Sequence, residues 1–116
     1  MQSYMMIFRG GDDAMVKMSP DEIQQHMGQW FAWVDKLTKE GRYVSGEPLV
    51  MEGKVVRAKG VITDGPFAEG KELVGGFFIV KAKSIEEACD MAKVCPSFQF
   101  DGATVEIRQV QEMEHA

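Results

Sequence analysis

His26 is the residue of this sequence best suited to acid–base chemistry, because imidazole exchanges protons near neutral pH. It falls in a stretch with helical spacing of apolar residues, four positions before Trp30, so the two rings share a helix face. Three roles are open to His26. It could pack on Trp30 at the edge of the core, act as a general acid or base at the mouth of a cleft, or bind a metal.

The acid–base role benefits from a nearby carboxylate, and the sequence offers Asp64 in the stretch Asp64-Gly65-Pro66-Phe67. Asp, Gly and Pro are typical of a turn, so the alternative is that Asp64 only binds its own backbone. We predict His26 and Asp64 as the catalytic pair. The predicted walls of the ligand pocket are Trp30, Trp33, Tyr43, Glu47, Pro66 and Phe67.

The sequence gives little support to a metal or cofactor site. Cys89 and Cys95 are six residues apart, which fits neither a CxxC redox pair nor a zinc site. Cys89 repeats with the apolar residues of its helix, so we expect it to be buried. Cys95 has no base adjacent in sequence that would make it a reactive thiolate. We therefore predict no metal and no cofactor.

Charge and hydropathy patterning indicate the class of protein. The 116 residues carry 13 Lys and Arg against 18 Asp and Glu, a net charge of −5. An acidic chain disfavours nucleic-acid binding, which depends on cations that neutralise phosphates. Neither a membrane-spanning apolar run nor a secretion signal is evident in the sequence. We expect a cytoplasmic protein with no membrane or nucleic-acid partner.

Capping signals and hydrophobic periodicity predict two helices within one domain, residues 1–116. Ser19 and Glu22 form a capping box for a helix from Pro20 to about Glu40, and Ser84 and Glu87 form another for a helix ending near Val94. Strands are expected at 3–9, 43–50, 55–58, 61–63, 73–80 and 104–110, with a turn at 52–54 and a flexible tail at 111–116.

This order predicts the split β-α-β pattern of ferredoxin-like α+β folds. Two helices then cover one face of an antiparallel sheet, and the other face stays apolar and open. Such a sheet closes by pairing with a second copy, so we predict a homodimer.

Two segments, 61–69 (VITDGPFAE) and 71–78 (KELVGGFF), resemble the signature of the DGPF subgroup of the bacterial YCII-related family. The segments 4–7, 18–22, 46–49 and 105–108 are also similar to that family. The resemblance implies a dimeric ferredoxin-like α+β fold, related to the dimeric α+β barrels. The histidine and aspartate proposed as the site of YCII-like relatives fall here on Trp30 and Cys95.

One YCII-like relative is a dehydrochlorinase of a chlorinated hydroxyquinol. A shared family does not by itself carry a reaction across. From His26, Asp64 and the aromatic walls we predict a cofactor-independent lyase or isomerase acting on a small cyclic or aromatic molecule. The alternative is a non-catalytic small-molecule-binding or regulatory module, linked to sigma-factor signalling by family association. A third possibility is a dimeric scaffold without a ligand.

Overall fold

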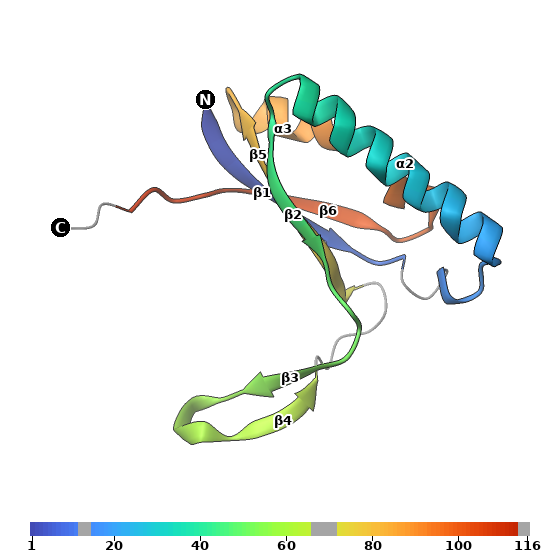
Figure 1. Ribbon diagram of the computed structural model, residues 1–116. Helices are drawn as coiled ribbons and strands as arrows, with labels where there is room; N and C mark the ends of the chain where they lie inside the picture. Colours follow the sequence, from blue (N-terminus) through green and yellow to red (C-terminus); the bar gives the residue numbers. More distant parts are fainter. Residues whose placement is uncertain (12–14, 66–71, 114–116) are drawn as a thin grey trace.

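A four-stranded antiparallel sheet forms the centre of the computed structural model, which describes residues 1–11, 15–65 and 72–113 (Figure 1). The strands lie in the order β2-β5-β1-β6. Their bounds are Gln2–Arg9 for β1, Tyr43–Pro48 for β2, Val74–Ala82 for β5 and Thr104–Gln109 for β6. This order confirms the predicted split β-α-β fold.

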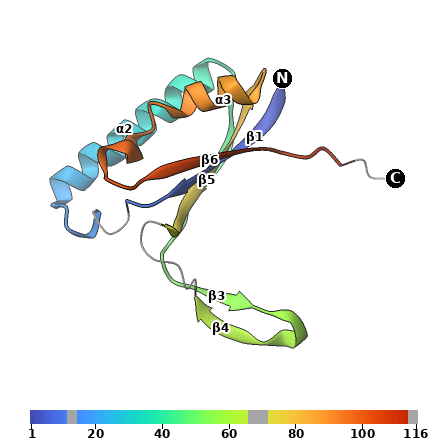
Figure 2. The same cartoon turned by 180° about the vertical axis from the view of Figure 1, so that it is seen from behind.

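Helix α2 (Pro20–Lys39) and helix α3 (Ile85–Ala92) both lie on the same face of this sheet (Figures 1 and 2). The predicted capping box of α2 is confirmed: the Glu22 N–H donates to Ser19 Oγ, and the Ser19 N–H donates to Glu22 Oε1. Ser84 also caps α3 through the Glu87 N–H, but the Glu87 carboxylate accepts from Lys83 instead of Ser84. The second predicted box is therefore only half formed.

The core lies between the helices and the sheet. Tyr4, Met6 and Phe8 alternate along β1 and are buried against the helices, as are Phe78, Val80 and Ala82 of β5. Trp33 and Leu37 of α2 and Ala88 and Ala92 of α3 complete this core. The intervening residues Met5, Ile7, Phe77 and Ile79 face the opposite, uncovered side of the sheet, because successive strand side chains alternate.

The predicted glycine irregularity in β5 is confirmed. Phe8 pairs with Gly76 and Arg9 with Val74, so Gly75 is an extra residue in the ladder. A Cβ at Gly76 would lie 2.8 Å from the Glu47 carbonyl oxygen, which explains why no larger residue fits there.

The turns predicted at residues 52–54 and at Asp64-Gly65 are wrong. No tight turn joins β2 to the next strand. Instead β3 (Gly53–Val56) pairs with β4 (Ile62–Gly65), and the chain reverses at η1 (Ala58–Gly60). The predicted turn residues Asp64 and Gly65 belong to β4, opposite Lys54 and Gly53.

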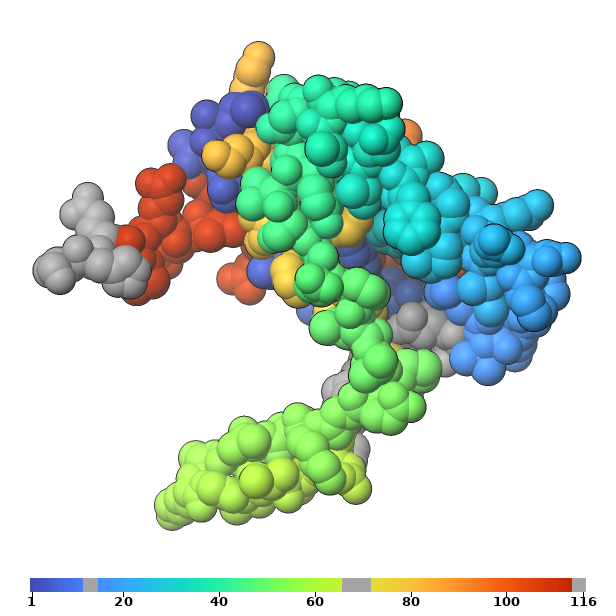
Figure 3. Space-filling view, viewed as in Figure 1, coloured from blue at the N-terminus to red at the C-terminus, as the bar shows by residue number. Residues whose placement is uncertain are grey.

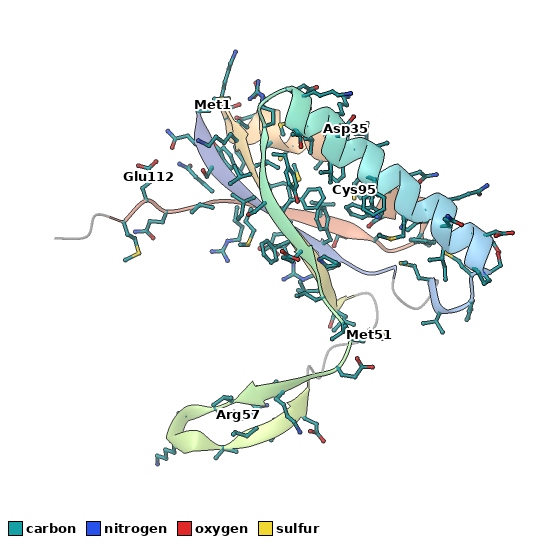
Figure 4. All side chains as sticks on the ribbon, viewed as in Figure 1. Met1, Asp35, Met51, Arg57, Cys95 and Glu112 are labelled. Atoms are coloured by element: carbon teal, nitrogen blue, oxygen red, sulfur yellow. The ribbon has the colours of Figure 1, made fainter. Side chains whose placement is uncertain are left out.

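We call residues 53–65 the arm. It stands clear of the sheet and helices in the space-filling view, joined to β2 by a narrow neck (Figure 3). Figure 4 labels Met51, just before the arm, and Arg57, which follows β3 within it.

The prediction that Cys89 is buried is wrong as well. Cys89 is exposed, whereas Cys95 is buried with the core residues. The register of the short α3 places Ala88 and Ala92 inward, and Cys89 follows Ala88 by one residue, so its side chain turns outward.

Candidate functional site

A cavity of about 420 Å³ lies between the first half of α2 and the sheet, at the end where β2 leaves the core. Short segments from β1, β2, β5 and α2 line it, together with η3 (Pro96–Gln99) and Phe100. Its volume falls in the range of small-molecule sites. The lining residues include Phe8, Met15, His26, Met27, Trp30, Phe31, Tyr43, Gly46, Glu47, Phe78, Ser97 and Phe100.

Aromatic rings form the inner wall of the cavity. Phe8 contacts Trp30 and Phe78 edge to face, with centroid distances of 5.0 Å in both pairs. Tyr43 meets Phe78 in the same way at 5.2 Å. Each ring is held by its neighbours, so the wall is a rigid apolar surface suited to a flat ring.

His26 is a buried polar residue of this cavity, with 3% of its surface exposed. The Trp30 indole Nε1–H donates to His26 Nε2 over 3.0 Å, across one turn of α2. The Phe100 ring lies 5.0 Å away on another side. Within residues 1–11, 15–65 and 72–113, His26 Nδ1 has no hydrogen-bond partner.

This arrangement fixes the form of the imidazole. An indole N–H is a donor only, so Nε2 must accept with its lone pair and the proton of neutral His26 stays on Nδ1. Leaving a buried donor without an acceptor costs about 1–3 kcal/mol. An acceptor atom of a ligand would remove that cost.

Tyr43 and Glu47 of β2 both line the cavity. Burial raises the pKa of the Tyr43 phenol, and the Glu47 carboxylate raises this pKa further. The phenol therefore stays protonated at neutral pH and can donate. A larger residue would not fit at Gly46, because a Cβ there would clash with the Phe78 ring and lie 2.9 Å from Tyr43 Oη.

The structure brings together His26, Trp30, Tyr43 and Glu47 of the predicted site. Trp33 instead lies in the core behind Trp30, with a centroid distance of 5.6 Å. Pro66 and Phe67 are outside the described residues.

Asp64 does not line this cavity. It is exposed on the arm, and Lys54 Nζ lies 2.6 Å from its Oδ1. In the described part of the chain, no carboxylate is hydrogen-bonded to His26. The predicted pairing of His26 with Asp64 is thus not formed within one copy.

Sequence reasoning missed Phe8, Phe78, Phe100 and Ser97. Phe8 and Phe78 belong to the alternating apolar pattern of their strands, which predicts that they are buried. The neighbouring residues in the sequence do not indicate that a cavity lies beside them. Ser97 and Phe100 follow α3 at 97–100, and only the tertiary fold brings this segment to α2.

The described residues contain no cluster of three metal-ligating side chains, and none of their helices is long and apolar enough to span a membrane. Cys95 is no nucleophile in this setting, because burial raises the pKa of its thiol.

We compared the chain with known proteins. Curated sequences gave no match. Among solved structures, the chain is similar to a 5-chloro-2-hydroxyhydroquinone dehydrochlorinase from Burkholderia phenoliruptrix AC1100, in complex with 2,5-dihydroxybenzoquinone. That structure is 15% identical, with a TM-score of 0.45 over 98% of this chain and 95% of its own. A likeness this distant transfers no activity. The model of the YCII-related domain matches residues 3–114, and the chain therefore belongs to the YCII-related family.

Proposed function

We propose that the cavity binds a small planar cyclic molecule with a ring oxygen substituent and catalyses proton transfer on it without a cofactor. This reaction class includes lyases and isomerases. One observation carries the proposal: a buried histidine lines an aromatic cavity while its Nδ1 lacks an acceptor among the described residues.

In this proposal the His26 Nδ1–H donates to the ring oxygen of the substrate. A neutral imidazole donor polarises a carbonyl group and acidifies the adjacent carbon. We assign the proton transfer from that carbon to Glu47, because this residue lines the cavity and its charge raises the pKa of the Tyr43 phenol. Trp30 and Phe78 hold the ring in place.

The test follows exchange of solvent deuterium into the α-carbon of cyclohexanone and 2-cyclohexenone by NMR. The wild-type chain should accelerate the exchange, and both H26A and E47Q should reduce it. Binding of these ketones to H26A should be roughly tenfold weaker, as expected for loss of about 1.4 kcal/mol.

The matched control is D64N, which removes a carboxylate outside the cavity and should exchange like the wild type. If D64N alone abolished exchange, Asp64 would be the acting carboxylate, and our assignment of Glu47 would be wrong. If neither ketone shifts resonances of cavity residues, the proposed substrate class is wrong.

A second candidate is a binding module without catalysis. It is favoured by the bond from Trp30 to His26 Nε2, which occupies the lone pair that a general base needs. Saturable binding of a ring ketone with no added deuterium exchange would support this candidate over the enzyme.

We propose further that two copies pair through the uncovered sheet face. Met5, Ile7, Phe77 and Ile79 are half-buried there, on two adjacent central strands. A contiguous apolar face of this kind is typical of an interface.

A further inference from the structure

The arm exposes a pair of large apolar side chains. Val56 and Ile62 are directly paired across β3 and β4, and they are 70% and 62% exposed. Because they lie directly opposite each other, their side chains share one face of the arm. We call this pair the apolar strip.

The arm is also too small to be stable alone. Each of its strands has four residues, and a two-stranded hairpin is marginal in water without a surface to pack on. The Lys54–Asp64 ion pair that joins the strands is exposed, so it adds little. We infer that another surface covers the strip.

The position of the arm indicates which surface this is. The arm leaves the end of β2 and extends on the side of the sheet opposite to α2 and α3, as both views show (Figures 1 and 2). The uncovered sheet face and the arm thus form two sides of one corner. A body that covers Ile7 and Ile79 also lies within reach of the arm.

Charge indicates the nature of that body. The arm carries Lys54, Arg57 and Lys59 against Asp64, a net charge of +2. The whole chain carries −5, so the remainder carries −7. The arm is therefore electrostatically complementary to the rest of its own chain.

We propose that the arm clasps a second copy of this chain, with each arm of the pair lying against the acidic body of its partner. The proposal rests on the homodimer proposed above and adds a second contact to it. Two-fold symmetry makes the contact reciprocal, so both apolar strips are covered.

The first test measures dimer dissociation by analytical ultracentrifugation of the full chain. V56D should raise the dissociation constant at least about tenfold, because it places a charge in the strip and lowers the positive charge of the arm. V94D is the matched control: Val94 is 62% exposed after α3, away from the arm, and its change should leave the constant unaltered. Salt should also weaken the wild-type dimer.

Two outcomes would overturn the proposal, and they differ in meaning. A wild-type dimer that V56D leaves equally tight overturns the arm contact and leaves the sheet-face dimer standing. A wild-type monomer at micromolar concentration overturns both.

The second test remains valid if V56D unfolds the arm. Equal amounts of ¹⁴N- and ¹⁵N-labelled wild-type chain are mixed and treated with a carbodiimide, which joins an amine to a touching carboxylate. Lys59, exposed near the tip of the arm, should form peptides in which the two isotopes are joined. Peptides that join Lys59 only to carboxylates of the same chain would overturn the clasp, as would coupling only to another, co-purified protein.

Discussion

At the scale of residues, one hydrogen bond decides what His26 can do. The sequence predicted the contact between His26 and Trp30, because i and i+4 side chains meet on any helix. It did not predict the direction of the bond, which makes His26 a donor through Nδ1. Nor could it place Asp64, because that position depends on where the arm points, which local rules do not determine.

The substitution W30F tests this bond. It retains an aromatic ring in the cavity wall and removes the donor, so His26 Nε2 loses its partner. The histidine should then shift from the Nδ1–H form toward a mixture of both tautomers, which the ¹⁵N chemical shifts of the ring nitrogens report. We expect a stability loss of roughly 1 kcal/mol from the lost hydrogen bond.

W33F is the control for that experiment. Trp33 is buried in the same helix, and its indole makes no hydrogen bond with His26. Its replacement should cost stability while the tautomer of His26 stays as in the wild type. Equal ¹⁵N shifts in wild type and W30F would contradict the bond from Trp30.

At the scale of elements, the sequence predicted the helix ends better than it predicted which strands pair. Helix caps depend on side chains within three residues, so Ser19 and Glu22 were identifiable from sequence. Strand pairing in the arm was not, because several apolar runs compete for the same neighbours. Pro48 lacks an N–H and ends β2, and Lys59 and Gly60 adopt φ of 67° and 78° to reverse the chain.

Glu87 shows how a cap residue becomes a link between elements. Its carboxylate accepts from the Lys83 N–H and from Arg42, whose guanidinium also donates to the Lys81 carbonyl oxygen. The Lys83 bond, followed by the charge of Arg42, holds the pKa of Glu87 below its ordinary value of 4.5, while partial burial opposes this shift. Glu87 therefore ties the start of α3 to the end of α2.

This lowered pKa predicts a pH dependence. A group with a depressed folded-state pKa contributes stability above its unfolded pKa and loses it as pH falls through the folded value. E87Q should therefore melt at a lower temperature than wild type at pH 7, and the difference should shrink below about pH 4. Thermal unfolding followed by circular dichroism measures both curves.

E86Q serves as the neighbouring control, because Glu86 is exposed and makes none of these bonds. Its melting temperature should follow that of the wild type at every pH. A difference between E87Q and wild type that persists unchanged to pH 3 would contradict a charge-dependent link.

At the scale of the whole molecule, the helices cover one face of the sheet and leave the other face uncovered. The order of elements alone predicted this, because a split β-α-β chain places both helices on the same side. The cavity did not follow from that order. It depends on small residues at close approaches, Gly46 and Gly76, whose effect appears only when the strands are paired.

The last prediction concerns the uncovered face of the sheet. Ile7 lies near its centre on β1, paired with Phe77, so I7D puts a charge where a partner sheet would pack. An unpaired buried charge is costly, whereas the same charge in a monomer stays in water. We expect light scattering to give twice the 13.0 kDa chain mass for wild type and the single chain mass for I7D. I85D, the same change at a 43% exposed residue on the helix side, should remain a dimer. Circular dichroism must show that I7D is folded, since a folded I7D dimer would place the interface elsewhere.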